Sequence, residues 1–385
     1  MKDRIHVAVI AGLIALAAAP GRADAPARPG IVLEEFVYTT GPAASVHAST
    51  IVELATGELV AAFFGGPAEG DPDVEIWLAR KPPDGAWSAP VSVADGRLAG
   101  GERVPAWNPV LFEKPGGELL LFYKLGPSPG EWWGMVKSSR DGGRTWSAGR
   151  RLGEGLIGPV KNKPVRLESE GQGAIVAGSS TEHDGWRVHV ERSTDGGATW
   201  RRIGPLETVG EIGAIQPALM TFGNGRLGML CRTQSENGFM AESWSDDGGR
   251  TWSPLAPGVL PNNNSGFDVA TLGDGRHLIV YNHSTREQAG MGHKGRGILN
   301  VATSDDGRQW NAALVLEHLD APNRQFSYPA VIQGRDGLVH VVYTWHRERI
   351  KHVVLDPGSL PEIPMPDGDW PSEGPASLSA YEELP

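Results

Sequence analysis

The sequence of 385 residues contains one cysteine, Cys231, so the chain can form no internal disulfide and must take its stability from its core. It has no Cys/His pairs at zinc-binding spacing and no glycine-rich phosphate-binding loop. We therefore expect neither a bound metal nor a cofactor.

Basic residues are in the minority. The chain has 35 Lys and Arg against 46 Asp and Glu, which gives a formal net charge of −11. A general nucleic-acid binder needs a basic face that displaces counterions. The composition therefore argues against nucleic acid as a partner.

Long apolar runs are missing after the first twenty or so residues. Lys2 and Arg4 precede an apolar stretch at 7–19, and Ala23-Asp24-Ala25 resembles a signal-peptidase site. The stretch is shorter than the roughly 20 residues that a membrane helix needs. We predict a cleaved signal peptide at 1–25, a periplasmic or secreted mature chain and no membrane span after cleavage, with an uncleaved anchor as the alternative.

Glycine (52) and tryptophan (13) are abundant, and they gather in a repeated turn. The pattern S-x-D-x-G-x-T-W occupies 139–146, 193–200 and 245–252, with a shortened copy at 304–310 and a worn copy at 84–87. Its aspartates lie 52 to 59 positions apart, which is the period of a propeller or a solenoid. Short apolar runs between glycine turns predict strands, and no long stretch has helical periodicity. The turn itself has a structural explanation, since Asp and Ser can bond turn amides.

A second repeat aligns six strand starts, each with a polar first residue. These residues are His47, Asn108, Lys163, Gln216, Asp268 and Tyr328. Sixteen positions later stand Phe63, Lys124, Ser179, Arg232 and Thr344, with Asn282 as the equivalent in the fifth segment. We predict an all-β, six-bladed propeller over 30–357, with these side chains lining the mouth of its central channel. The alternative is that they only satisfy one another around a wet axis.

The remaining segment, 358–385, is acidic and rich in proline. It has no core-forming periodicity, and we predict a tail that is a closing extension or partly disordered.

The aspartate turns (Asp boxes), the signal peptide and the six-fold repeat together resemble the sialidase superfamily, in its BNR-repeat, sialidase-like branch. The stretches 262–268 and 326–332 carry the same resemblance. It covers roughly residues 30–357 and is more specific for fold than for activity. In working members three arginines hold the substrate carboxylate, a tyrosine activated by a glutamate attacks the anomeric carbon, and an aspartate is the acid/base.

The resemblance implies roles for several residues. Tyr328 would be the nucleophile, Arg232 and Arg296 two of the clamp arginines, and Asp71 or Asp73 the acid/base. Arg296 is equally compatible with a surface loop, and Asp71 and Asp73 with a solvated acidic loop.

Two positions depart from the family pattern. His47 stands in the region where the first clamp arginine is expected, and Gln216 replaces the glutamate. A glutamine cannot take a proton at neutral pH. The sequence therefore leaves open whether the protein has the activity of a standard sialidase.

The leading hypothesis is an exported glycoside hydrolase that acts on a terminal acidic sugar. Arg232 would grip the carboxylate, His47 would serve as donor or base, and the lysines would add positive charge. The supporting set is Lys124, Lys161, Lys163, Asn108, Asp268 and Asn282, with Trp107, Trp132 and Trp133 as sugar-stacking walls or as packing between blades. The alternatives are a uronate-specific lyase and a non-catalytic binder of acidic glycans. The oligomeric state stays open.

Overall fold

The computed structural model describes residues 28–168, 173–234, 236–285 and 292–382. The predicted signal peptide lies outside these ranges. Among the residues described, no helix has the length and apolar character needed to cross a bilayer.

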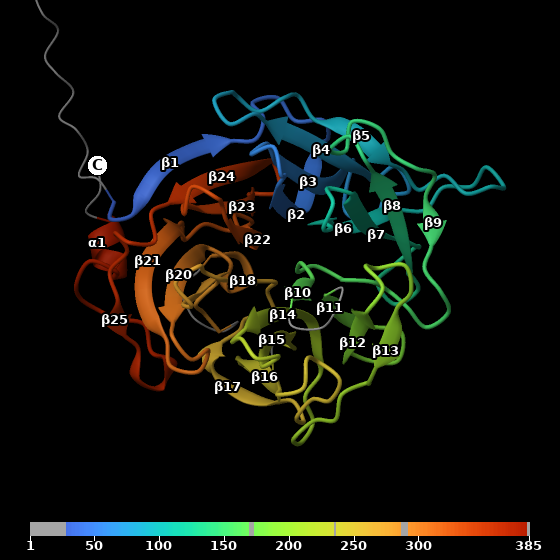
Figure 1. Cartoon of the computed structure of the whole chain (residues 1–385). Helices are drawn as coiled ribbons and strands as arrows, with labels where there is room; N and C mark the ends of the chain where they lie inside the picture. Colours follow the sequence, from blue (N-terminus) through green and yellow to red (C-terminus); the bar gives the residue numbers. More distant parts are fainter. Residues whose placement is uncertain (1–27, 169–172, 235, 286–291, 383–385) are drawn as a thin grey trace, which may run out of the picture.

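The strands form six sheets around a central axis (Figure 1). The first blade contains β2 (Ser45–Glu53), β3 (Leu59–Gly66), β4 (Glu75–Lys81) and β5 (Val91–Ala94). The second contains β6 (Ala106–Glu113), β7 (Leu119–Leu125), β8 (Trp133–Ser139) and β9 (Arg150–Arg151). The third contains β10 (Val165–Leu167), β11 (Ala174–Thr181), β12 (Arg187–Ser193) and β13 (Arg201–Ile203). In each of these three blades the strands follow the order of the sequence from the axis of the propeller to its rim.

The second half of the ring repeats this plan. The fourth blade contains β14 (Ala214–Thr221), β15 (Leu227–Thr233), β16 (Phe239–Ser245) and β17 (Ala256–Pro261). The fifth contains β18 (Asp268–Thr271), β19 (His277–Tyr281), β20 (Ile298–Ser304) and β21 (Asn311–His318), and the loop before β20 includes η1 (His293–Gly295). The sixth contains β22 (Phe326–Gln333), β23 (Val339–Trp345) and β24 (Arg349–Leu355). The predicted six-bladed, all-β propeller is confirmed.

The N-terminal strand closes the ring. β1 (Ile31–Phe36) is antiparallel to β24, with Ile31 opposite Leu355 and Phe36 opposite Lys351. It thereby supplies the outer strand of the sixth blade, beside β24 in Figure 1. A strand from one end of the chain thus completes a sheet built from the other end.

The core lies between neighbouring blades. Every residue of β3 and of β7 is buried, because each of these strands is covered on both faces by adjacent blades. Between the first two blades, Phe64 packs with Leu111 and Leu121 in one apolar cluster. This packing explains why the strands read as continuous apolar runs rather than as alternating ones.

The aspartate turns link the third and fourth strands of a blade. In the second blade, the hydroxyl of Ser139 accepts a bond from the Gly143 amide at 2.6 Å, and the carboxylate of Asp141 accepts one from the Thr145 amide at 2.9 Å. The third blade repeats these contacts at Ser193 and Asp195. The turns lie at the rim, where they hold the hairpins together.

The C-terminal segment packs against the fifth blade. β25 (Ile363–Pro364) pairs with β21, and η2 (Pro366–Gly368) and α1 (Leu378–Glu382) follow it. Met365 and Ala376 are buried in the core cluster of that blade. Residues 358–382 therefore extend the propeller at its rim (Figure 1).

Candidate active site

Four blades carry a β-bulge near the start of their innermost strand. At each bulge one residue has positive φ: Ala48 (54°), Asn108 (37°), Gln216 (54°) and Tyr328 (53°). Bulges re-aim side chains, and a bulky residue in the left-handed region is energetically unfavourable. Backbone strain of this kind gathers at functional sites, which directs attention to Gln216 and Tyr328.

The bulges also correct the predicted register of the first blade. Trp107 pairs with Lys124, Ile215 with Arg232, and Ser327 with Thr344, whereas His47 pairs with Phe64. The equivalents in the first blade are therefore Ala48 and Phe64, and not His47 and Phe63. A proline follows the bulge residue in the other three blades, and Ser49 takes its place in the first, so the proline signal that marks the register is missing there.

The hydroxyl of Tyr328 receives two hydrogen bonds. Gln216 Nε2 donates one at 3.2 Å, and Arg232 Nη1 donates the other. Arg232 also donates to Gln216 Oε1 at 3.1 Å and, through Nε and Nη2, to Asn264 Oδ1 at 2.9 and 2.6 Å. The tyrosine oxygen is thus fixed between a guanidinium and an amide.

Cations surround the ring of Tyr328. The charged groups of Arg232, Lys161 and Arg296 lie 5.7, 5.8 and 6.0 Å from the ring centroid. Burial lowers the pKa of Lys161 to about 7, and burial together with Arg232 lowers the pKa of Arg296 to about 10. Arg296 donates to the Asn264 carbonyl at 2.8 Å, and its Nε is buried without a partner in the described structure. These groups favour negative charge at this end of the channel.

A third arginine joins this cluster from the last blade. Arg347, in the turn between β23 and β24, lowers the pKa of both Arg296 and His47 through its charge. Its Nη1 forms an ion pair with Glu69 at 2.9 Å. The sequence has no arginine in the first-blade region where the family's first clamp arginine is expected, and sequence reasoning did not single out Arg347, since only the fold brings the last hairpin near Arg296 and His47.

The ring of His47 lies against that of Tyr328 in a tilted contact, with centroids 4.1 Å apart and an interplanar angle of 46°. Its Nδ1 lies 3.0 Å from the hydroxyl of Thr344. Burial, followed by the charges of Arg347, Arg296 and other cations, lowers the pKa of His47 well below its usual value. The imidazole is therefore neutral at neutral pH.

The acidic loop between β3 and β4 contributes three carboxylates. Asp71 Oδ1 accepts from the Asp73 amide at 2.8 Å, and Asp73 pairs with Arg103 at 3.2 Å. Glu69 is the member of the loop that forms an ion pair with the arginine cluster, through Arg347.

A further carboxyl group, Glu182, lies in the loop between β11 and β12. It is mostly buried and receives a hydrogen bond from the Trp186 side chain, and the Trp186 ring lies 5.1 Å from the guanidinium of Arg232. Burial raises the pKa of Glu182, although Arg232 partly offsets the effect. A carboxyl group with a raised pKa can donate a proton near neutrality. No motif marks this residue in the sequence.

The other predicted ring residues have partners within the protein. Lys163 pairs with Asp268, which also accepts from the Val331 amide at 2.9 Å. The amide of Asn282 donates to the Phe326 carbonyl at 2.9 Å, joining the fifth and sixth blades.

Lys124 is fully buried in the second blade. It donates to the Pro159 carbonyl and, at 3.5 Å, to the carbonyl of the bulge residue Asn108. Burial lowers its pKa to about 7. Within the described ranges no three His, Cys, Asp or Glu side chains are arranged to hold a metal ion.

Solved structures with the same fold include several sialidases. A protein of unknown function from Dyadobacter fermentans has 16% identity and a TM-score of 0.67, with 85% of this chain and 99% of that chain covered. The NanB sialidase of Streptococcus pneumoniae, as its K499G mutant, has 13% identity and a TM-score of 0.63, with 87% and 71% covered. The intramolecular trans-sialidase of Ruminococcus gnavus has 13% identity and a TM-score of 0.63, with 86% and 99% covered. At these identities the likeness establishes the fold.

The family comparison is more direct. The chain matches none of the curated protein sequences. The profile of the BNR repeat-like domain, however, matches residues 57–341, which is most of the propeller. The chain therefore belongs to the BNR repeat-like family.

Proposed function

We propose that the protein is an exported, sialidase-like glycoside hydrolase that acts on a terminal sugar bearing a carboxylate. The observation that carries the proposal is the convergence of Arg232 and Arg296 on Tyr328, with Arg347 near enough for its charge to lower the pKa of Arg296. Arginine pairs with carboxylates through two parallel hydrogen bonds, so a cluster of three suits an acidic sugar. The likeness to structures described as sialidases supports the same class.

Tyr328 would attack the anomeric carbon or stabilise the positive charge that develops there. A neutral phenol is repelled less by the carboxylate of the sugar than an ionised nucleophile would be. Gln216 cannot take the proton of Tyr328, but with Arg232 it holds the oxygen in place and favours negative charge on it.

The leaving oxygen needs a proton donor. Asp71 and Asp73 stay candidates through the family resemblance, and the structure adds Glu182, whose raised pKa suits general-acid catalysis. Export rests on the predicted signal peptide at 1–25 and is part of the proposal.

A turnover screen of the purified mature protein tests the hydrolase. The substrates are an aryl α-sialoside, a ketosidic glycoside of an eight-carbon sugar acid and a set of uronate-capped oligosaccharides, each repeated with Tyr328→Phe. Release of a sugar acid by the wild type, lost in the variant, is the expected result. If the wild type releases none while it still binds acidic glycans, the protein is a binder and the proposal fails.

One observation favours a uronate lyase as the second candidate. A neutral His47 contacts the ring of Tyr328, and the amide of Gln216 stands where the hydrolases of this fold are expected to have a glutamate. In this reaction the two residues would abstract and donate protons while Arg232 neutralises the uronate. A product that absorbs in the ultraviolet would identify this activity.

A further inference from the structure

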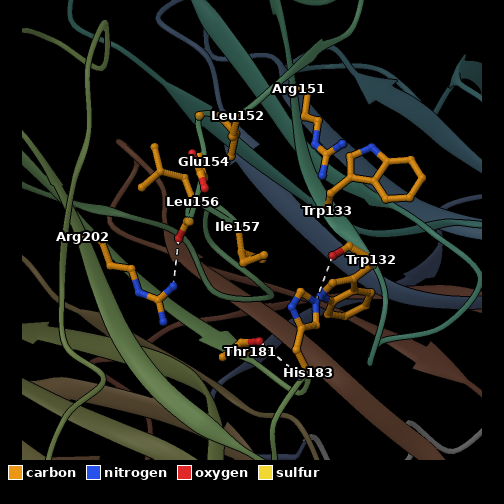
Figure 2. A pocket seen from close by; sticks show the side chains of 12 residues that line it. Trp132, Trp133, Arg151, Leu152, Glu154, Leu156, Ile157, Thr181, His183 and Arg202 are labelled. Atoms are coloured by element: carbon orange, nitrogen blue, oxygen red, sulfur yellow. Dashed lines mark hydrogen bonds between the residues drawn. The ribbon is translucent and has the colours of Figure 1, made fainter.

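A second site lies between the second and third blades. It is a cavity of about 490 Å³ with walls from the start of β8, the segment 151–157, the end of β11 and β13. Its main side chains are Trp132, Trp133, Arg151, Ile157, His183 and Arg202 (Figure 2).

A chain of ring contacts connects the cavity with Tyr328. Trp132 contacts Trp107, with centroids 6.0 Å apart, and Trp107 contacts Phe64 at 5.9 Å. Phe64 in turn contacts His47 at 5.6 Å, and His47 contacts Tyr328 at 4.1 Å. A wall of contacting, buried rings therefore leads from the cavity to Tyr328.

Both loops that carry the candidate acids border this wall. Gly70 lies over Trp107, since a Cβ placed on that glycine would be 3.6 Å from the indole. On the other side, Thr181 and His183 line the cavity and flank Glu182 in the chain. A sugar in the cavity would thus lie near the two chain segments that carry the candidate acids.

The polar groups of the cavity favour an anion. Arg151 stacks on Trp133 at 5.1 Å, and Arg202 donates to the Gly155 carbonyl at 3.0 Å. Neither arginine has a carboxylate within 4 Å in the part of the chain that the structure describes. The lining has one carboxylate, the exposed Glu154, against these two guanidinium groups.

Trp132 supplies an unused donor. Its side chain is 3% exposed, and its Nε1 has no partner among the described residues. A buried indole N–H usually finds a hydrogen-bond acceptor, such as a hydroxyl oxygen of a sugar. Figure 2 shows Trp132 beside His183, which contacts its carbonyl at 3.0 Å.

We propose that this cavity binds the sugar on the leaving-group side of the scissile bond, and that this sugar is itself anionic. Its carboxylate or sulfate would pair with Arg151 and Arg202, and its ring would lie against the tryptophans. The inference rests on the proposed function and narrows the substrate to glycans with two neighbouring acidic sugars.

Binding of single sugars tests the cavity without turnover. The probes are the methyl glycosides of glucuronic acid, N-acetylglucosamine 6-sulfate and glucose, titrated into the wild-type protein by calorimetry or ligand-observed NMR. We expect the glucuronide, the sulfated sugar or both to bind, with the neutral glycoside at least about tenfold weaker. The two anionic probes distinguish a carboxylate from a sulfate.

Variants locate the binding site. Arg151→Ala and Arg202→Ala should each weaken binding of the anionic probe about tenfold. Arg140→Ala removes an arginine with an 89% exposed side chain elsewhere on the second blade and should leave binding unchanged. The titration is repeated in Arg232→Ala, which removes the carboxylate contact of the arginine cluster, and the binding that remains should still weaken about tenfold when Arg151→Ala is added. Equal binding of the neutral sugar, or no effect of either cavity variant, would overturn the proposal.

Kinetics then relate the cavity to catalysis. Arg151→Ala should lower kcat/KM about tenfold for a disaccharide with an anionic leaving sugar and leave an aryl glycoside unaffected. An equal loss on both substrates would contradict a leaving-group subsite. If no substrate is turned over, the hydrolase proposal fails, while the binding titrations still decide whether the cavity takes anionic sugars.

Discussion

Tyr328 combines an unfavourable backbone conformation with a hydroxyl that accepts bonds from two donors. Strain of this kind persists only where the surroundings hold it. Here the bulge, Gln216 and Arg232 hold it, so the position of the oxygen is set before a ligand arrives. The residues around it differ in charge and burial, and each makes a separate prediction.

Glu182 should control the alkaline side of the pH profile. Its raised pKa means that it is protonated to a higher pH than an ordinary glutamate, and activity should fall as pH rises through that pKa. Glu182→Gln should reduce kcat about 100-fold on substrates with poor leaving groups, with little effect on activated aryl glycosides.

Steady-state kinetics over pH check this role. Glu207→Gln, at an exposed position, is the matched control and should behave as wild type. An unchanged alkaline limb in Glu182→Gln would exclude this residue as the proton donor.

Arg347 should contribute to binding of the sugar acid. Arg347→Gln removes one of three guanidinium groups from the cluster and should weaken binding of the released sugar acid about tenfold. Glu69→Gln keeps the arginine and removes only its ion pair, so it should not weaken binding. Calorimetry measures the affinity of both variants for the sugar acid. An equal loss of affinity in the two variants would show that binding depends on the ion pair between Glu69 and Arg347 and not on the arginine itself.

At the scale of elements, the loop that shapes the cavity depends on one buried carboxylate. Glu191, on β12, accepts bonds from the amides of Ile157 and Gly158 at 2.7 and 3.0 Å and from His189 Nε2 at 3.0 Å. The side chain is 1% exposed. The third blade thereby holds the loop that leaves the second.

Removing this carboxylate should destabilise the protein. Glu191→Ala leaves its donors buried and unpartnered, and we expect a loss of about 3 kcal/mol in the free energy of unfolding. Glu168→Ala, whose side chain is 81% exposed in an ion pair with Arg166, should cost less than about 0.5 kcal/mol. Urea denaturation compares the two, and similar midpoints would refute the structural role of Glu191.

The strands and turns also show how much of the structure could be predicted from the sequence. The period of the aspartate turns predicts a propeller, because each turn ends the same hairpin, and the six aligned strand starts give the number of blades. The register of the first blade could not be predicted from residue spacing alone. A bulge adds a residue to its innermost strand, and Ser49 stands where the other three bulged strands have the proline that marks the register. Tyr328, Arg232 and Arg296 follow from the family resemblance. Arg347 and Glu182 belong to hairpin loops of other blades, and only closure of the ring brings them to the site.

At the scale of the whole molecule, buried histidines make stability depend on pH. Burial lowers the pKa of His277, His283 and His340 to about 4, against about 6.5 when unfolded. Between these values the unfolded chain binds more protons, so the contribution of these histidines to stability is full above pH 6.5 and falls as pH drops towards 4. Each histidine contributes a slope of up to about 1.4 kcal/mol per pH unit, while Glu182 acts weakly in the opposite sense.

Urea denaturation at neutral pH and at about pH 5 checks this dependence. The midpoint should fall with pH, and less steeply in His277→Gln, which removes one titrating group. A midpoint that does not change over this range would show that the histidines are already protonated in the folded protein.

The pairing of β1 with β24 has a consequence for synthesis. Ile31 meets Leu355, and 355 − 31 = 324 residues separate them along the chain. β1 must therefore wait unpaired until the 324 residues up to its partner have been synthesised. Contacts of such long range form slowly and late. A chain whose synthesis stops before β24 would have an unpaired β1 at one side of the ring and an unpaired strand edge at the other. Quality-control proteases of the cell would encounter the chain in this incompletely folded state.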